Sequence, residues 1–424
     1  MSKNVIEVLK ERGFIEALTS EEIATLAKQP IRVYCGFDPT GDSLHLGNLV
    51  AVMGLAWFQR FGHTPVAIVG GATGMIGDPS GKSHERNLLD EATIKKNLEG
   101  ISLNLKQVLD FHADNGTIVL NNFDWMKGFS YIQFLRDVGK HFRIGPMLAK
   151  DSVKTRLASE EGMSYTEFSY QLLQAYDFHY LLQNHDVQIQ LGGSDQWGNI
   201  TAGIDLIRRL QGKSAYGVTF PLLTRSDGQK FGKSEKGAIW LSAEKLSPYE
   251  FYQYLIRTAD ADVIKLLKML TFMEIDEIHA IEAQMQQSDY EANSAQKRLA
   301  EEVTKIVHGE EGLRDAQRVT AAAAPGGSTQ LNAETLESLA KEIPNISLSR
   351  EEVVEAKLID LIVQMKMLDS KGAVRRLIRN GGVYLNNEKV NDENHTVSDD
   401  DLVDGKLLLI AVGKKNKAVV QLKD

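Results

Sequence analysis

The stretch YCGFDPTGDSLHLGN, residues 34–48, contains the features that decide the fold. The apolar run at 31–35 has the character of a β-strand and leads through Gly36 into a turn rich in Asp, Pro and Gly. The residues that follow, 49–61, have helical period. A strand, a tight turn and a helix in this order predict one unit of an α/β sheet.

The turn places a histidine near the start of the predicted helix. Asp42 or Ser43 is expected to cap the helix, and His45 and Asn48 then lie on one side of its first turn, where backbone N–H groups favour anions. His45 can donate a hydrogen bond to a phosphate there, and Gly47 leaves room for a flat ring over the backbone. An ordinary turn with a surface histidine accounts for this stretch equally well.

The pattern of strand and helix continues beyond this stretch. Apolar runs at 66–70, 117–120 and 187–191 are separated by segments of helical period such as 131–141. This alternation predicts an α/β domain over about residues 30–225, with a parallel sheet covered on both faces. Ligands of such sheets bind beyond the carboxyl ends of the strands. We therefore expect the turns YCGFD, VGGATG and QLGGSDQWG to line one crevice.

The remainder of the chain predicts further domains. The pattern from 247 to about 324 is helical throughout, and we expect no strand there. AAAAPGGSTQ begins a linker, and two short helices then precede short strands, which predicts a small α+β domain. The predicted segments are 1–225 for the α/β domain, 226–246 for a connection, 247–320 for the helical domain, 321–354 for the linker and 355–424 for the last domain.

Composition limits the class of protein. The 424 residues carry a formal net charge of −9, so contact with nucleic acid requires a local basic patch. Cys35 is the one cysteine, which excludes an internal disulfide and a cysteine-rich zinc site. The first residues lack the long apolar core of a signal peptide, and no apolar run approaches a membrane span. These features predict a cytoplasmic protein without a membrane segment.

A second glycine-containing stretch, KFGKSEKG, carries Lys230 and Lys233 three residues apart. Two ammonium groups on such a loop suit a phosphate chain whose charge shifts during a reaction, whereas a lone lysine-rich loop is more often a solvated surface. GDPSGKS at 77–83 resembles the end of a P-loop, but Ile76 stands where that motif requires glycine. A P-loop nucleotidase is therefore the weaker interpretation.

Together these motifs carry a family resemblance. HLGN resembles the HIGH motif of class I aminoacyl-tRNA synthetases, and KFGKS resembles their KMSKS motif. YCGFDPT, GGATGMIGDPS, YTEFSYQLLQAYDF and GGSDQWGNITAGIDLIRR are similar to bacterial tyrosyl-tRNA synthetases, and the similarity covers nearly the whole chain. The chain departs from the motifs at Asn48, Phe231 and Gly232. Asn48 can donate a hydrogen bond but has no role in proton transfer.

The resemblance implies a fold and an activity. The fold is a Rossmann-type nucleotide-binding domain with a parallel sheet, an all-helical domain on the anticodon side and a small α+β RNA-binding domain. The activity is tyrosine–tRNA ligation: ATP and L-tyrosine give tyrosyl-adenylate and pyrophosphate, and the 3′-terminal adenosine of tRNA(Tyr) then receives the tyrosyl group. Mg²⁺ accompanies the ATP without a protein metal site, and a homodimer is implied.

The resemblance also implies roles for individual residues. For tyrosine these are Asp78, Tyr170 and Gln174 at the ammonium, Tyr34 and Asp177 at the phenol, and Gln196 near the carboxylate. For ATP they are Cys35, Gly36, Asp38, Gly47, Asn48, Gly193, Asp195 and Lys233. Charge on the reacting phosphates is stabilised by Thr40, His45, Lys82, Arg86, Lys230 and Lys233.

Several of these residues also have an ordinary structural explanation. Tyr34 fits a core tyrosine, Asp177 and Asp195 fit helix caps, and Cys35 fits a small buried hydrophobe.

The last domain carries a predicted RNA-binding face. Basic residues recur along SKGAVRRLIRNG with helical spacing, and the resemblance adds a second basic patch near the C-terminus. The residues are Lys371, Arg375, Arg376, Arg379, Lys414, Lys415 and Lys417. A solvated helix face is the alternative explanation of these basic residues. Two alternatives to the activity also remain: a class I synthetase for another amino acid such as tryptophan, and an RNA-binding protein on a synthetase scaffold.

Overall fold

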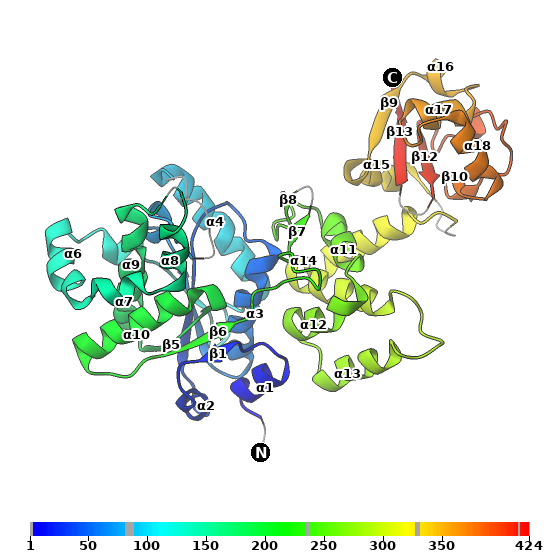
Figure 1. Cartoon of the computed structure of the whole chain (residues 1–424). Helices are drawn as coiled ribbons and strands as arrows, with labels where there is room; N and C mark the ends of the chain where they lie inside the picture. The colour runs from blue at the N-terminus through cyan, green and yellow to red at the C-terminus, as the bar shows by residue number, and fades with distance from the viewer. Residues whose placement is uncertain are drawn as a thin grey trace. The chain divides into compact units, whose positions relative to one another are not determined.

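The computed structural model describes residues 3–80, 89–160, 162–234, 237–326, 331–413 and 416–423. The side chains of Lys233 and Ser234 are not among the described ones. The chain divides into two compact units (Figure 1). Unit 1 is Met1–Leu246 with Leu255–Val307, and unit 2 is Ser247–Tyr254 with His308–Asp424.

Unit 1 is built on a six-stranded sheet of order β1-β6-β5-β2-β3-β4. Apart from the short edge strand β1, whose pairing with β6 is antiparallel, the neighbouring strands are parallel. The predicted parallel α/β sheet is confirmed. The strands are β1 Ala17–Leu18, β2 Arg32–Phe37, β3 Thr64–Val69, β4 Ile118–Asn121, β5 Val187–Gly193 and β6 Tyr216–Phe220.

The strand order explains where a ligand can bind. The chain proceeds from β2 to β3 and β4 on one side, and then places β5 and β6 on the other side of β2. A parallel sheet has its topological switch point where the order reverses, and a crevice opens there at the carboxyl ends of the strands. The crevice of unit 1 therefore lies where β2 and β5 end, at YCGFD and QLGGSD.

Helices cover this sheet and supply its core. Tyr34, Val66 and Ile68 of the sheet pack against Phe178 and Leu181 of α9. The helices of unit 1 up to residue 246 are α1 Val5–Glu11, α2 Glu22–Leu26, α3 Leu46–Arg60, α4 Glu91–Val108, α5 Phe123–Met126, α6 Tyr131–Asp137, α7 Ile144–Leu148, α8 Asp151–Leu157, α9 Tyr165–His185 and α10 Trp197–Gln211. The predicted helix over 131–141 is shorter than expected, because a 3₁₀ turn at Gly139–His141 follows α6.

The helical stretch after residue 247 agrees with the prediction. It consists of α11 Pro248–Ile256, α12 Asp260–Leu270, α13 Ile275–Gln284 and α14 Ser294–Ala322, and no strand interrupts its described residues. Gly309 breaks the helical geometry of α14 with a φ of 71°. This conformation favours glycine, and it falls where the chain passes from unit 1 to unit 2.

A buried arginine anchors the helical stretch within unit 1. The Arg12 guanidinium donates hydrogen bonds of 2.7 Å to the carbonyls of Lys268, Thr271 and Met273, at and beyond the end of α12. It also lies 4.6 Å from the ring centroid of Trp57, on α3. Burial lowers the pKa of Arg12 to about 10, so the group remains a cation at neutral pH. The N-terminal helix, α3 and α12 are thereby fixed together.

Unit 2 carries a five-stranded sheet of order β11-β10-β12-β13-β9. The predicted helices and strands after residue 355 are present as α17, α18, β10 and β12. Part of the predicted linker is folded: Leu336 and Leu339 of α15 are buried against Leu407 and Val419, and β9 pairs parallel with β13. The elements are α15 Ala333–Glu342, β9 Asn345–Leu348, α16 Arg350–Val353, α17 Leu358–Gln364, α18 Lys371–Arg379, β10 Val383–Leu385, β11 Glu388–Lys389, β12 Leu407–Val412 and β13 Asn416–Leu422.

The sequence analysis did not predict α15 and β9, because their burial depends on strands that come later in the chain. Within the described ranges, no helix has the length and apolar character that crossing a membrane requires.

Candidate active site

The crevice at the carboxyl ends of the strands holds a cavity of about 390 Å³. Most of the residues predicted to bind a ligand line it, although they come from separate parts of the chain. They are Tyr34, Cys35, Gly36, Asp38, Thr40, His45, Gly47, Asn48, Asp78, Tyr170, Gln174, Asp177, Gly193, Asp195, Gln196 and Lys230. Lys82 and Arg86 lie outside the described residues, as does the side chain of Lys233.

The HLGN segment forms the N-terminus of α3 in a way the sequence analysis did not predict. His45 itself is the N-cap: its Nδ1 accepts from the Gly47 N–H at 3.1 Å, and its own N–H donates to Asn48 Oδ1 at 3.1 Å. The expected cap by Asp42 or Ser43 is wrong, because those side chains bond to other elements. Since Nδ1 accepts a hydrogen bond, the proton of a neutral His45 is on Nε2.

The KFGKS segment lies directly against HLGN. Gly232 has a φ of 88°, and a Cβ built on it would lie 3.1 Å from the backbone nitrogen of Gly47. The Leu46 N–H donates to the carbonyl of Ile239 at 2.8 Å, a few residues after the loop. These contacts bring the His45 and Lys230 segments to the same cavity, although 185 positions separate them in the sequence.

One end of the cavity, here called its floor, is formed by the buried side chains of Tyr34 and Gln190, which carry polar atoms without a hydrogen-bond partner among the described residues. These atoms are the hydroxyl of Tyr34 and Oε1 of Gln190. Both side chains line the cavity. A buried polar group without a partner is costly, so a polar ligand group at this position would stabilise the site.

Asp177 adds a carboxylate to the same floor. It accepts hydrogen bonds from Asn122 Nδ2 at 2.9 Å and from Trp125 Nε1 at 2.8 Å, so it is not a helix cap. Burial raises the pKa of Asp177 to about 7, although both hydrogen bonds act in the opposite direction. Each carboxylate oxygen retains a lone pair that can accept from a ligand.

A second carboxylate is joined to the first by a chain of hydrogen bonds. Asp38 accepts from the hydroxyls of Tyr170 and Thr73, each at 2.7 Å. Asn122 Nδ2 lies 2.9 Å from Thr73 Oγ1 and 2.9 Å from Asp177. Asp38, predicted to contact ATP, and Tyr170, predicted to contact an ammonium, are therefore paired with each other in this structure.

Amides gather around Asp78 at another part of the cavity. Gln196 Nε2 donates to Asp78 Oδ2 at 2.7 Å, and Gln174 Nε2 donates to Gln196 Oε1 at 3.2 Å. Asn199 Nδ2 reaches Gln174 Oε1 at 3.1 Å and lies 3.3 Å from Asp78 Oδ1. The structure thus brings together three residues predicted for one ligand, Asp78, Gln174 and Gln196, and adds Asn199.

Residues predicted to contact ATP lie where β2 and β5 end. A Cβ on Gly193 would approach Asp195 Oδ1 to 2.6 Å, and a Cβ on Gly47 would approach His45 Cε1 to 3.0 Å, so both glycines keep room for a neighbouring side chain. Burial, followed by the nearby charge of Asp78, raises the pKa of Asp195. Asp195 makes no cap of α10, whose N-cap is Gln196. Burial raises the pKa of Cys35 to about 12, so it remains a thiol.

The sequence analysis missed Asn122, Trp125, Asn199 and Gln190. A signal for two of them was available, because Asn122 and Trp125 follow the strand β4 at its carboxyl end, where ligand contacts are expected. Asn199 and Gln190 gave no such signal, since an amide within a helix or strand acquires its role only from the partners that the fold supplies.

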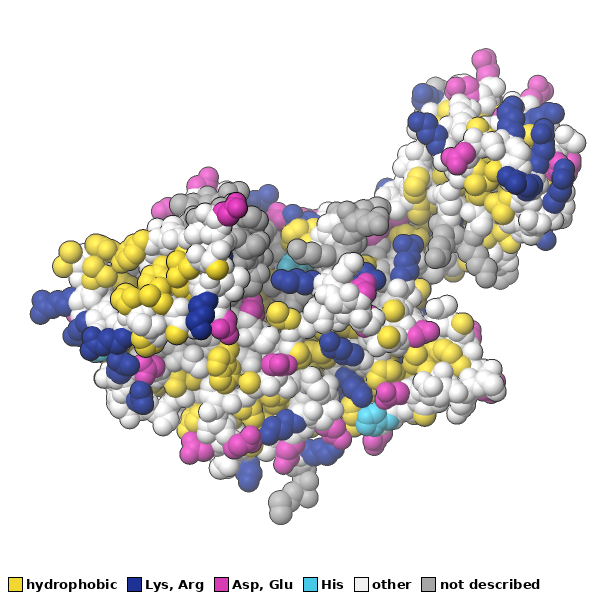
Figure 2. Space-filling model, in the orientation of Figure 1, with side chains coloured by type: hydrophobic (Ala, Val, Ile, Leu, Met, Phe, Trp, Pro, Cys, Tyr) yellow, Lys and Arg dark blue, Asp and Glu magenta, His cyan; other side chains and the backbone are white. Residues whose placement is uncertain are grey.

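The predicted RNA-binding residues lie in unit 2. Arg375 and Arg376 of α18 are exposed, whereas Lys371 pairs with Asp360 and Arg379 pairs with Glu393. Figure 2 shows basic side chains on this unit. Lys417 is in β13, and Lys414 and Lys415 lie outside the described residues.

A parallel sheet whose carboxyl edge joins an HLGN helix start and a KFGKS loop at one cavity defines a class I aminoacyl-tRNA synthetase. A family model described as "tRNA synthetases class I (W and Y)" matches residues 26–323, and one described as "Tyrosine--tRNA ligase SYY-like C-terminal domain" matches residues 335–420. The chain belongs to the tyrosine–tRNA ligase family.

Relatives agree with this membership. The chain is 65% identical over 99% of both chains to a tyrosine–tRNA ligase of Protochlamydia amoebophila, and 52% identical to a chloroplastic/mitochondrial one of Arabidopsis thaliana, over 99% of this chain and 84% of that one. Among solved structures, a C-terminally truncated mitochondrial tyrosyl-tRNA synthetase of Aspergillus nidulans is similar with a TM-score of 0.66 and 33% identity, over 74% of this chain and 92% of that one.

The environment of Asp177 predicts an unusual titration. Because burial disfavours the carboxylate, Asp177 should hold its proton below about pH 7 in the ligand-free protein and release it above. Infrared difference spectra should show a protonated carboxyl band that disappears with a midpoint near pH 7 and is absent from Asp177→Asn. Asp124→Asn, which alters an exposed carboxylate of α5, should leave the band unchanged. A band that is already lost below pH 5 would contradict the assignment.

Proposed function

We propose that the chain catalyses tyrosine–tRNA ligation in two steps at this cavity. L-tyrosine and ATP give tyrosyl-adenylate and pyrophosphate, and the tyrosyl group then passes to the 3′-terminal adenosine of tRNA(Tyr). The observation that carries the proposal is the single cavity lined by His45, Lys230, Tyr34 and Asp177. It offers a place for phosphates and a buried polar floor for a phenol.

The floor accounts for the choice of amino acid. The phenol of a bound tyrosine pairs with the hydroxyl of Tyr34 and the carboxylate of Asp177. Phenylalanine leaves the Tyr34 hydroxyl without a partner and brings no donor to Asp177, and the loss of a buried hydrogen bond to a charged group is expensive. Asn122 and Trp125 hold Asp177 in place for this contact.

The cluster around Asp78 suits the other end of tyrosine. Asp78 and Gln174 receive the ammonium, and Gln196 lies beside the carboxylate. Tyr170, whose hydroxyl donates to Asp38, presents its oxygen as an acceptor to the ammonium. The distance between this cluster and the floor then selects an amino acid with a long aromatic side chain.

ATP binds where β2 and β5 end. Cys35, Gly36, Asp38, Gly193 and Asp195 border the nucleoside, with Asp195 as the acceptor for ribose hydroxyls. Gly47 and Asn48 lie at the N-terminus of α3, where N–H groups and the helix dipole favour phosphate. Mg²⁺ accompanies the triphosphate.

The first step needs alignment and charge stabilisation. The tyrosine carboxylate is already an anion when it attacks the α-phosphate, so no general base and no covalent enzyme intermediate are required. His45 carries its proton on Nε2 and donates it as a hydrogen bond to the phosphates. Thr40, Lys82, Arg86, Lys230 and Lys233 stabilise the charge that grows on the departing pyrophosphate.

The second step needs the tRNA. Arg375 and Arg376, with Lys371, Arg379 and the patch of Lys414, Lys415 and Lys417, bind its phosphates. Lys371 and Arg379 exchange their present carboxylate partners for phosphate.

The domain division and the cytoplasmic location stay predictions from the sequence.

We also propose that the protein is a homodimer. Large apolar side chains on α6, α7, α8 and the start of α9 are exposed, among them Ile132 at 71%, Ile144 at 62% and Tyr165 at 63%. Figure 2 shows apolar side chains gathered over this part of unit 1. Contiguous apolar surface of this kind is typical of an interface, and a second copy of the chain fits it because a two-fold contact pairs one such face with another.

The activity is tested by tyrosine-dependent exchange between ATP and pyrophosphate. Tyrosine should support exchange, whereas phenylalanine and tryptophan should not. His45→Ala should slow adenylate formation by about a hundredfold, because it removes a donor to the phosphates, and change the tyrosine Kd by less than about twofold. His112→Ala, an exposed histidine, is the matched control. Equal losses of rate and tyrosine affinity would refute the assignment of His45.

The RNA-binding face is tested by charging of tRNA. Replacing both Arg375 and Arg376 with alanine should raise the KM for tRNA about tenfold and leave pyrophosphate exchange unchanged, because these residues contact only phosphates of the RNA. Arg350→Ala, which alters an arginine of the same unit that is paired with Asp399, should change neither. Unaltered charging by the double variant would show that α18 is not the binding face.

The dimer is tested by mass in solution. The unaltered chain should have the mass of two copies by sedimentation equilibrium, and Ile132→Glu together with Ile144→Glu should shift it toward one, because burying a carboxylate in an apolar interface is unfavourable. Leu103→Glu is the control, since Leu103 is 62% exposed on α4. A monomeric unaltered chain would exclude the proposal.

A further inference from the structure

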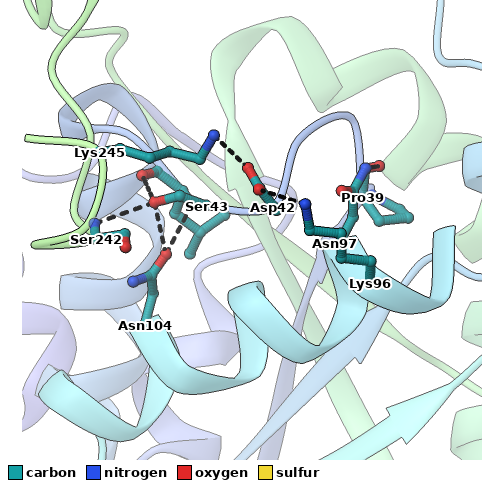
Figure 3. A network of polar contacts seen from close by, with 9 residues as sticks. Pro39, Asp42, Ser43, Lys96, Asn97, Asn104, Ser242 and Lys245 are labelled. Atoms are coloured by element: carbon teal, nitrogen blue, oxygen red, sulfur yellow. Dashed lines mark hydrogen bonds and ion pairs between the residues drawn. The ribbon is translucent and has the colours of Figure 1, made fainter. Parts of the chain in front are cut away.

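The turn at Asp42, Ser43 and Leu44 is held from two sides by elements distant in the sequence (Figure 3). It lies between Thr40 and His45, two residues assigned above to phosphate binding. One side is α4, and the other is the segment 239–245, which follows the KFGKS loop. The position of this turn therefore affects the positions of Thr40 and His45.

The contacts with α4 are close and buried. Asn104 Oδ1 accepts from the Leu44 N–H at 2.8 Å and lies 3.0 Å from Ser43 Oγ. Asn97 lies on the same face of the helix, seven residues earlier, and its Nδ2 donates to the carbonyl of Pro39 at 2.8 Å. Between them, a Cβ on Gly100 would come within 1.9 Å of the Asp42 carbonyl oxygen. This face of α4 thus fits the turn backbone with no room for a side chain.

Three of the contacts with 239–245 follow one antiparallel register, and an ion pair lies two residues beyond it. The three pair residues 46, 44 and 43 with residues 239, 241 and 242, and the ion pair joins the side chains of residues 42 and 245. They are Leu46 N–H to the Ile239 carbonyl at 2.8 Å, Leu241 N–H to the Leu44 carbonyl at 2.9 Å, Ser242 N–H to Ser43 Oγ at 3.1 Å, and Lys245 Nζ to Asp42 Oδ1 at 2.5 Å.

The Asp42–Lys245 ion pair is connected to the cavity through Trp240. Lys245 Nζ lies 5.1 Å from the ring centroid of Trp240, and the Trp240 ring centroid lies 6.4 Å from that of His45. Trp240 lines the cavity, and its ring is 3.7 Å from a Cβ built on Gly41. The ammonium of Lys245 therefore holds Trp240 on the turn as well as pairing with Asp42.

We propose that Asp42 and Lys245 are positioning residues for the activation step. Their ion pair holds the segment after the KFGKS loop against the start of α3, so that Lys230 and His45 face the same triphosphate. Neither residue needs to touch the substrate. The inference rests on the proposed function, because it takes both segments to act on ATP.

The pair is the part of this junction that can be adjusted without loss of the fold. The side chains of Asp42 and Lys245 are 28% and 33% exposed, whereas Asn97 and Asn104 are buried. A partly exposed ion pair contributes little to overall stability. It can still set the geometry of a loop, and a small displacement of reacting groups reduces the rate considerably.

The test compares the nucleotide and amino-acid parameters of pyrophosphate exchange. Lys245→Met and Asp42→Asn should each raise the KM for ATP, or lower the exchange rate, by about three- to tenfold, because the segment after the loop loses one of its attachments to the turn. The tyrosine Kd should stay within about twofold, since tyrosine is held by the floor and the Asp78 cluster. The double variant should be no worse than either single one, and exchanging the charges in Asp42→Lys with Lys245→Asp should restore most of the loss.

Lys96→Met is the matched control. Lys96 is a second cation near the same carboxylate, 3.6 Å from Asp42 Oδ2, but its side chain is 75% exposed and α4 is held by Asn97 and Asn104 without it. The Lys96→Met variant should catalyse pyrophosphate exchange with the same KM for ATP and the same rate as the unaltered protein. An equal defect in Lys96→Met would show that loss of positive charge, and not of position, is responsible.

Two further results would overturn the inference. One is unaltered exchange kinetics in Lys245→Met, and the other is a parallel loss of tyrosine affinity. An unaltered chain without exchange activity would instead refute the proposed function, so the two failures are distinguishable. Ser43→Ala, which removes the acceptor of the Ser242 N–H, provides a second variant with the same expected ATP-specific defect.

Discussion

The structure depends on one backbone contact, the approach of the KFGKS loop to the first turn of α3. At Gly232 the loop passes so close to Gly47 that a side chain has almost no room, and the hydrogen bond from Leu46 to Ile239 continues the contact. This contact brings Lys230 of the loop to the cavity at the N-terminus of α3, beyond the end of β2. The sheet supplies a crevice at its switch point, but the loop converts the crevice into a cavity with cationic and polar walls.

The buried acids at the base of this cavity impose a second constraint. Asp177 is buried and Asp38 is partly buried, and an isolated buried carboxylate is unfavourable. The chain of Tyr170, Thr73 and Asn122 supplies neutral donors to both acids. A neutral network leaves the pKa of Asp177 raised and its remaining lone pairs available. A salt bridge at this position would have satisfied the carboxylate and occupied the place of a ligand.

The sequence allowed the sheet and the HLGN and KFGKS segments to be predicted, because their signals are local. Strands buried on both faces are continuous apolar runs, and glycine, histidine and lysine mark the turns that follow them. The edge strand β1 was missed because two residues have no pattern of their own and depend on β6. The cap by His45 was missed because an imidazole rarely takes that position, and α15 and β9 were missed because their partners, Leu407 and β13, come far later.

The two parts of the cavity differ in how they are built, and we therefore expect them to differ in how far they can move. The floor proposed for tyrosine is built on β2, β5 and α9, whose side chains pack in the core, and its proposed selectivity follows from hydrogen bonds that phenylalanine would leave unmade. The side proposed for phosphate is built on loops joined by backbone hydrogen bonds and a partly exposed ion pair. A phosphate chain changes its charge and geometry as pyrophosphate departs, whereas a phenol does not. In the proposed function, the part packed in the core therefore selects the amino acid, and the part built on loops adjusts as the reaction proceeds.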